Sequence, residues 1–272
     1  MTDHYAVVGN PVAHSASPQI HAEFARETAQ DLDYVRLLAP LDGFAACIAD
    51  FRARGGRGVN VTLPFKLEAY QLAQQRSERA VQAEAVNTLM FDGGTVYGDN
   101  TDGAGLVRDL EVNLGFALAG KRVLLMGAGG AARGVLRPLL EQKPAALTIV
   151  NRTLEKAHAL ARQFAPWGRC AVCGYGELGG LRFDLIINAT AAGVGGARAP
   201  VPESVFAADM LAYDMMYGQA TPFMQAAAGR GARVSDGLGM LVEQAAESFL
   251  LWRGVRPHTA QVIAKLRVDL AA

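Results

Sequence analysis

The 272-residue sequence predicts an α/β protein with mostly parallel sheets. Short apolar runs alternate with segments of helical periodicity from one end of the chain to the other, which is the pattern of repeated βαβ units. Hydrophobic residues make up 51% of the chain and charged residues 19%, which suits one large or two modest globular domains. We expect two α/β domains, over residues 1–103 and 104–237, and a C-terminal helical segment over residues 238–272 that packs back on the first domain.

In the first domain, apolar runs predict four strands with helices between them, near residues 5–8, 34–38, 58–61 and 87–91. The clearest helix start is Ser17 followed by Pro18, because an N-cap hydroxyl and a proline at the first helical position both favour a helix N-terminus. The helix that leaves this domain is predicted by leucines spaced four residues apart, Leu106, Leu110 and Leu114.

The second domain repeats the alternation of strands and helices. Its strands are expected at residues 123–126, 147–150, 185–188 and 211–214, and its helices at residues 131–142 and 154–164. A glycine-rich turn at residues 236–239 precedes a long helix with an apolar face, expected over residues 238–253. No stretch reaches ~18 consecutive apolar residues, so no membrane span is predicted.

Charge and cysteine content exclude several kinds of partner. Lys plus Arg and Asp plus Glu number 26 each, so no bulk field favours nucleic acid or an anionic membrane, and a small-molecule ligand is expected. Cys47, Cys170 and Cys173 are too few for a disulfide framework, and the last two, expected in a short strand, lack a second pair for a zinc site. We therefore predict no metal. The N-terminus has no signal-peptide pattern, which favours the cytoplasm.

A glycine-rich turn follows the predicted strand at residues 123–126 and begins a helix, which is the context of a dinucleotide-binding turn in a Rossmann-type, doubly wound domain. Gly127 is expected to form the sharp turn, Gly129 to admit a pyrophosphate, and Ala132 to allow close helix packing. The helix N-terminus then supplies N–H groups and partial positive charge. The predicted cofactor-binding residues of this turn are Gly127, Ala128, Gly129, Gly130 and Ala131.

The end of the next strand indicates which dinucleotide binds. An acidic residue about 20 positions after the turn holds the ribose 2′-hydroxyl of NAD, whereas an arginine accommodates the 2′-phosphate of NADP. Here Arg152 stands 23 positions after Gly129 (152 − 129), between Asn151 and Thr153, and Lys156 follows. The cofactor is therefore predicted to be NADP. Taken alone, this domain leaves alternatives open. Arg152 is then simply a solvated residue after a strand, or the Rossmann unit belongs to a methyltransferase or to a non-catalytic sensor.

Six short motifs occur in order along the chain. They are Gly9-Asn10-Pro11 with His14-Ser15-Ala16-Ser17-Pro18, Asn60-Val61-Thr62-Leu63-Pro64-Phe65-Lys66, Ala85-Val86-Asn87-Thr88, Gly98-Asp99-Asn100-Thr101-Asp102-Gly103, Asn151-Arg152-Thr153 and Asp236-Gly237-Leu238-Gly239-Met240-Leu241. Together they resemble the motif set of the shikimate dehydrogenases over nearly the whole chain. The resemblance implies an NADP-dependent oxidoreductase that reversibly reduces 3-dehydroshikimate to shikimate in the aromatic amino acid (chorismate) pathway.

The resemblance also implies a role for each matching residue. Ser15 and Ser17 bind the substrate carboxylate, and Lys66 is the catalytic acid/base, with Asp102 beside it. Ring hydroxyls are bound by Thr62, Asn87 and Asp102. Shorter local motifs imply further substrate residues, Tyr217 and Gln244, and further cofactor residues, Met215, Gly239 and Glu78.

The chemistry of these side chains agrees with that implication. A polyhydroxylated carboxylate needs several neutral hydrogen-bonding groups, and ketone reduction needs a proton donor at the developing alkoxide, which a lysine ammonium supplies. Each residue also has a plain alternative: Ser17 and Asp102 as helix caps, Lys66 as a solvated lysine, Asn87 as a turn residue. Two rival functions remain, a quinate/shikimate dehydrogenase that uses NAD and a catalytically silent metabolite sensor. We expect a monomer or a homodimer.

Overall fold

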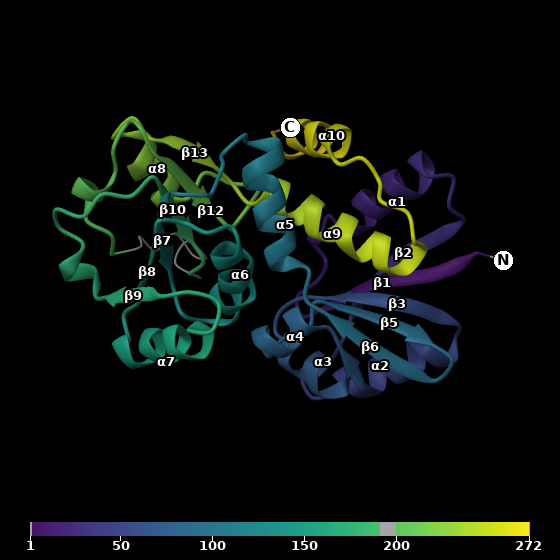
Figure 1. Cartoon of the computed structure of the whole chain (residues 1–272). Helices are drawn as coiled ribbons and strands as arrows, with labels where there is room; N and C mark the ends of the chain where they lie inside the picture. The colour runs from purple at the N-terminus through teal and green to yellow at the C-terminus, as the bar shows by residue number, and fades with distance from the viewer. Residues whose placement is uncertain (1, 191–199, 272) are drawn as a thin grey trace. The chain divides into compact units, whose positions relative to one another are not determined.

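The computed structural model describes residues 2–190 and 200–271, and the chain divides into two compact units. The first unit comprises Met1–Gly105 and Val242–Leu266, and the second comprises Leu106–Leu241 and Arg267–Ala272 (Figure 1). Each unit has its own sheet and its own hydrophobic core. Within the described ranges, none of the helices combines the length and the hydrophobicity that crossing a bilayer requires.

The first unit contains a six-stranded mixed sheet with the strand order β2-β1-β3-β5-β6-β4. Its strands are β1 (Asp3–Gly9), β2 (Leu32–Leu38), β3 (Gly56–Val61), β4 (Gln75–Arg76), β5 (Thr88–Asp92) and β6 (Thr95–Asp99). β1 pairs with β2 and β3 in parallel, whereas β5 pairs with β3 and β6 in antiparallel fashion. The hairpin of β5 and β6 was not anticipated, although Gly93-Gly94, both with positive φ, joins the two strands in a tight turn.

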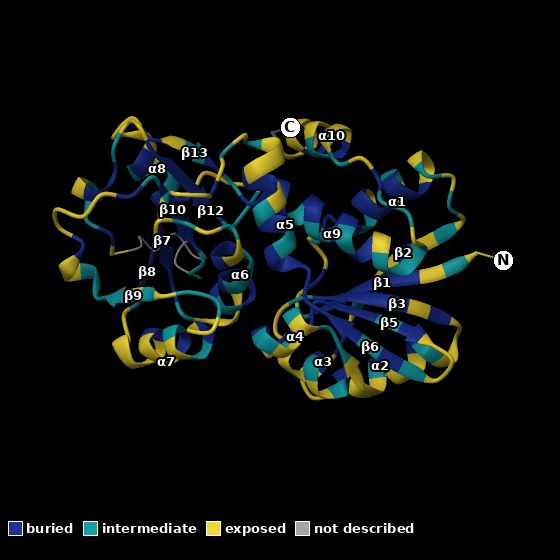
Figure 2. Ribbon diagram, in the orientation of Figure 1, coloured by how far each residue is buried: buried dark blue, intermediate teal, exposed yellow. Residues whose placement is uncertain are grey.

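Helices cover both faces of this sheet: α1 (Ser17–Glu27), α2 (Phe44–Ala53), α3 (Lys66–Leu72), α4 (Glu78–Ala83) and much of α9 (Leu238–Arg253). Alternate residues of β1 enter different cores. Ala6 and Val8 pack with Phe44 of α2 on one face, whereas Tyr5 and Val7 pack against Trp252 of α9 on the other. The central strands are consequently buried on both sides (Figure 2). The final helix is α10 (Ala260–Ala271).

The helix α1 begins at Ser17, but its N-cap differs from the predicted one. Ala16, not Ser17, is the N-cap residue, and Ser17 is the first helical residue, with Pro18 after it. The N–H of Ser17 donates to Oγ of Ser15 at 3.3 Å. The capping prediction for Ser17 was therefore wrong, because the turn that begins at Ser15 already satisfies this end of the helix.

The second unit contains a parallel sheet with the strand order β13-β12-β10-β7-β8-β9. Its strands are β7 (Arg122–Met126), β8 (Ala146–Val150), β9 (Cys170–Cys173), β10 (Leu185–Asn188), β12 (Leu211–Asp214) and β13 (Arg233–Ser235). The helices of this unit are the later part of α5 (Asp102–Arg108, continued by a π-helical turn, Asp109–Asn113), α6 (Gly130–Glu141), α7 (Leu154–Phe164) and α8 (Pro222–Ala228).

Strand order in the second unit reverses beside β7. From β7 the chain moves to β8 and β9 on one side, then returns to β10, β12 and β13 on the other. Both faces of the sheet are apolar, since Val123 and Leu125 enter one core cluster and Leu124 and Met126 enter another. This is a doubly wound, Rossmann-type arrangement, and ligands of such sheets bind at the carboxyl ends of the strands where the order reverses.

Candidate active site

Lys66 and Asp102 form an ion pair in the first unit. Lys66 is the first residue of α3, after the turn that follows β3, and Asp102 is the first residue of α5. Lys66 Nζ lies 2.6 Å from Asp102 Oδ2. The side chains are 29% and 11% exposed, so the ammonium is held in place yet remains reachable from solvent. Asp102 is oriented further by its own backbone N–H, which donates to the Asn100 side chain at 3.2 Å.

The Asn87 amide holds the other oxygen of that carboxylate. Its Oδ1 accepts hydrogen bonds from the Thr88 hydroxyl and from the backbone N–H and hydroxyl of Thr101. These donors fix which end of the amide is the oxygen. Its Nδ2 consequently points to Asp102 Oδ1 at 2.9 Å and to Gln244 Oε1 at 3.2 Å. The fold thus gathers four predicted site residues into one hydrogen-bonded cluster.

A buried polar layer beneath Asn87 was missed in the sequence. Asn60 Nδ2 donates to the hydroxyls of Ser248 and Thr88, at 2.9 and 3.1 Å, and its Oδ1 accepts from the Tyr34 hydroxyl at 2.8 Å. Ser248 lies one helical turn after Gln244 on α9. That spacing of four residues was a signal that the same helix face carries both polar side chains.

Ser15 and Ser17 lie together at the start of α1. Their hydroxyl oxygens are 3.1 Å apart, and Ser17 is buried whereas Ser15 is half-buried. The Tyr34 hydroxyl lies close enough to Ser17 to form a side-chain hydrogen bond with it. Thr62 follows β3, and its methyl group packs against the backbone of Gly9. All four of these side chains come from the first unit.

His21 lies on α1, the helix that begins at Ser17, and is fully buried. Its ring stacks on Tyr34 with a centroid separation of 4.2 Å and an interplanar angle of 5°. Burial lowers the pKa of His21 to about 3, although the Asn60 side chain opposes the shift. The ring is consequently neutral near neutral pH and packs as an aromatic residue.

The Asp99 carboxylate anchors the loop that carries Asp102. It receives two hydrogen bonds from the Arg79 guanidinium and others from the Ser77 hydroxyl and the Asn100 backbone N–H. Burial would raise the pKa of Asp99, but these donors hold it below its usual range. Arg79 also reaches Glu247 of α9 at 3.5 Å, so the network ties the loop to two helices.

The predicted dinucleotide turn lies between β7 and α6. Gly127 has φ +106°, which a residue with a side chain rarely adopts, and its N–H donates to the Val150 carbonyl at 2.8 Å. A Cβ added at Gly129 or Gly130 would meet no atom within 4 Å, so open space lies above the helix N-terminus. Ala132 is fully buried against the sheet. Among the described residues, no side chain caps α6. The turn therefore fits a pyrophosphate.

The end of β8 presents Arg152 to solvent, and Lys156 is exposed one turn further on. Asn151 Nδ2 donates to the Thr153 carbonyl at 2.8 Å, which closes the turn between them. Arg152 lies close enough to Tyr175 for its charge to oppose the rise in the Tyr175 pKa that burial causes. An exposed guanidinium at this strand end suits the 2′-phosphate of NADP.

The remaining predicted residues occupy different places. Met215 and Tyr217 follow β12 in the second unit, and the Met215 N–H donates to the Asn188 carbonyl at 3.1 Å. Gly239 packs against the Asp109 carboxylate so closely that a Cβ would lie 1.9 Å from it. Glu78, predicted near the cofactor, is an exposed residue at the start of α4 in the first unit.

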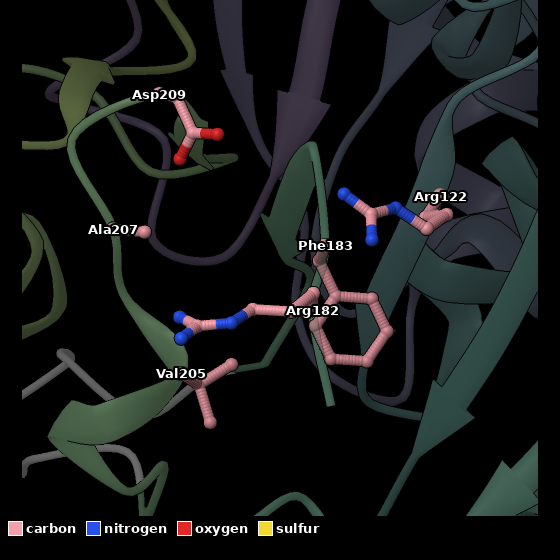
Figure 3. A pocket seen from close by; sticks show the side chains of 6 residues that line it. All are labelled: Arg122, Arg182, Phe183, Val205, Ala207 and Asp209. Atoms are coloured by element: carbon pink, nitrogen blue, oxygen red, sulfur yellow. The ribbon is translucent and has the colours of Figure 1, made fainter. Parts of the chain in front are cut away.

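A cavity of about 400 Å³ lies at the end of the second sheet opposite to the predicted dinucleotide turn (Figure 3). Its lining residues are Arg122, Arg182, Phe183, Val205, Ala207 and Asp209. These residues begin strands or precede them, so the cavity lies at the amino ends of β7, β10 and β12. It contains none of the predicted site residues and is at the wrong end of the sheet for a dinucleotide.

A Rossmann unit with a glycine-rich turn at a helix N-terminus, together with a unit that holds a lysine–carboxylate pair among neutral polar groups, is typical of a nicotinamide-dependent dehydrogenase. Family models match residues 7–89 (shikimate dehydrogenase substrate binding domain), 110–194 (shikimate / quinate 5-dehydrogenase) and 237–267 (shikimate 5'-dehydrogenase C-terminal domain). The chain belongs to the shikimate dehydrogenase family.

Individual relatives agree with this assignment. The chain is 60% identical over 274 residues to shikimate dehydrogenase (NADP(+)) of Dechloromonas aromatica and equally to that of Nitrosospira multiformis, with all of each chain covered. Among solved structures, shikimate 5-dehydrogenase of Thermus thermophilus, in complex with NADP(H) and shikimate, superposes with a TM-score of 0.88. That protein is 32% identical, and the match covers 98% of this chain and 99% of its own.

Proposed function

We propose that this protein catalyses the NADP-dependent interconversion of 3-dehydroshikimate and shikimate, a step of chorismate biosynthesis. The observation that carries the proposal is the Lys66–Asp102 pair, 2.6 Å apart and locked by the Asn87 amide. A ketone reductase needs a positioned proton donor, and a polyhydroxylated substrate needs oriented neutral groups. This cluster supplies both. Relatives of the chain that are 60% identical bear the name of that activity.

The cofactor site is assigned to the second unit. The N–H groups at the start of α6 would hold the pyrophosphate, and Arg152 with Lys156 would hold the 2′-phosphate. Bound NADPH supplies the hydride. On the family pattern, Met215 and Gly239 are assigned to the nicotinamide end, and Asn151 and Thr153 to further cofactor contacts. The same pattern adds Glu78, which belongs to the first unit.

The substrate site is assigned mainly to the first unit. Ser15 and Ser17 present paired hydroxyls to the carboxylate, and Thr62, Asn87, Asp102 and Gln244 present donors and acceptors to the ring hydroxyls. The family pattern adds Tyr217. Since the Asn87 amide is fixed by three donors, it offers substrate a defined orientation rather than an adaptable one.

Lys66 is assigned as the acid/base. As an ammonium it polarises the ketone and donates a proton from Nζ to the developing alkoxide, and in the reverse direction it takes up the hydroxyl proton. Asp102 holds Nζ through the bond at 2.6 Å, so the proton donor is in place before substrate arrives. Its other oxygen stays bonded to Asn87, which keeps the carboxylate from rotating away.

The test is an oxidation assay with the purified chain, shikimate or quinate, and NADP or NAD, followed by absorbance of the reduced nicotinamide. We expect the highest kcat/KM with shikimate and NADP. A preference for quinate and NAD would favour the rival dehydrogenase, and binding of shikimate by calorimetry without turnover would favour a sensor. We also propose that the protein is located in the cytoplasm. It is either a monomer or a homodimer, and light scattering distinguishes these two states by their molar mass.

A further inference from the structure

Arg36 contacts the segment that carries Ser15 and Ser17, and no role has been assigned to this contact so far. Its Nε and Nη2 both donate to the carbonyl oxygen of Ser15, at 3.0 and 2.6 Å. The backbone of Arg36 belongs to β2 and is paired with Val7 of the neighbouring strand β1. A rigid strand therefore delivers this guanidinium to the segment that carries both serine hydroxyls.

The charge of Arg36 is not neutralised. It is exposed, and in the part of the chain that the structure describes it forms no ion pair with a carboxylate. The other cation of the site, Lys66, is paired with Asp102. Ser15 and Ser17 themselves are neutral donors. Among the described residues, Arg36 is thus an uncompensated positive charge bonded to the candidate carboxylate site.

The two hydrogen bonds keep this charge close to that site. In a serine residue the carbonyl oxygen and the hydroxyl oxygen are about 3 to 5 Å apart, so the guanidinium lies within roughly 8 Å of the Ser15 hydroxyl. At that range, in a medium between water and protein, one unit charge changes the affinity for an anion by roughly three- to tenfold. The effect is modest because Arg36 is solvated.

We propose that Arg36 determines specificity for a carboxylate substrate by supplying positive potential at the Ser15–Ser17 site, with the Ser15 carbonyl as its anchor. The proposal rests on the proposed function, since it takes shikimate as the ligand. It explains how two neutral hydroxyls favour an anionic ring over an uncharged cyclic polyol. If Arg36 acts through its charge, its effect on substrate affinity depends on ionic strength and on the charge of the substrate. A purely structural role for the same hydrogen bonds would not show this dependence.

The test compares wild type, Arg36→Met, Arg36→Lys and a matched control, Arg54→Met. Arg54 is an exposed arginine of the first unit that directly follows α2 and is paired with Asp50. At low salt we expect Arg36→Met to raise the shikimate KM and calorimetric Kd roughly three- to tenfold, with kcat within about twofold. Arg36→Lys should retain most of the affinity, and Arg54→Met should change neither constant.

Two further measurements separate charge from structure. The difference between Arg36→Met and wild type should shrink as ionic strength rises from about 0.01 M to about 0.5 M, because the Debye length falls below the distance involved. With the uncharged methyl ester of shikimate, the two proteins should bind equally. An unchanged KM for shikimate at low salt, or an equal loss for the ester, would overturn the proposal while leaving the enzyme active. A wild type that neither binds nor oxidises shikimate would refute the proposed function itself.

Discussion

Replacing Lys66 by Met tests the acid/base assignment most directly. The substitution keeps most of the side-chain stem and removes the ammonium that lies 2.6 Å from Asp102. A positioned acid/base contributes about 10² to 10⁴ in rate, which is roughly 2.7 to 5.5 kcal/mol of activation free energy. We expect kcat and kcat/KM for shikimate to fall together by that factor, with little change in the Kd of NADP.

The same substitution leaves a carboxylate without its cation, so stability must be measured beside activity. Lys66 is 29% exposed and Asp102 keeps its bond to Asn87, so the loss should be smaller than for a fully buried pair, about 1 to 2 kcal/mol of unfolding free energy. Urea denaturation of both proteins measures it. A loss of this size leaves a stable enzyme to assay.

Lys66→Arg is the matched control. A guanidinium preserves the ion pair with Asp102 but does not give up a proton in a protein. It should therefore restore stability while leaving kcat low. Recovery of kcat by Lys66→Arg would show that Lys66 only positions Asp102. More than about a tenth of wild-type kcat in Lys66→Met would show that the proton comes from another group.

Three further outcomes are expected. Arg152→Ala should raise the Kd of NADP about 10- to 150-fold by calorimetry and barely affect NAD, because only NADP carries the 2′-phosphate; equal weakening would refute the assignment. Ser15→Ala and Ser17→Ala should raise the shikimate KM in steady-state assays without changing the Kd of NADP, and an unchanged KM in both would remove the carboxylate site from this segment. The folded-state pKa of His21, about 3, lies below its unfolded value, so its contribution to stability is lost as pH falls below about 6.5, by roughly 1.4 kcal/mol per unit. The unfolding free energy should fall less steeply with acid in His21→Phe, and identical slopes would contradict the burial argument.

Regular secondary structure was largely predictable because it depends on local patterns. The central strands of the second sheet, β7, β8, β10 and β12, are mostly apolar runs buried on both faces, and the turn at Gly127 needs a backbone conformation that restricts the residue type. The N-cap of α1 was wrongly assigned to Ser17, because the Ser15 hydroxyl makes the hydrogen bond at this end of the helix and accepts it from the Ser17 N–H. Local sequence does not reveal which of two nearby serines makes that bond.

The candidate site was predictable only in part, for a related reason. Motif residues such as Lys66 and Asn87 lie next to strand ends, where side chains of neighbouring strands meet. The polar layer formed by Asn60 and Ser248 depends on a contact between residues 188 positions apart. Hydrogen bonds of that kind arise from tertiary packing, so single-sequence periodicity gives no direct indication of them.

The first unit is discontinuous in sequence, and this has a consequence for synthesis on the ribosome. One face of its sheet is covered by α9, where Trp252 stacks on Tyr5 with a centroid separation of 4.6 Å and donates a hydrogen bond to the Leu89 carbonyl. The polypeptide completes Gly105 early, but Leu266 emerges 161 residues later (266 − 105). At about 5 to 20 residues per second, the nascent first unit waits roughly 8 to 32 s for the last of its residues. The Rossmann unit, although translated second, is the first of the two with nearly all of its chain available to fold.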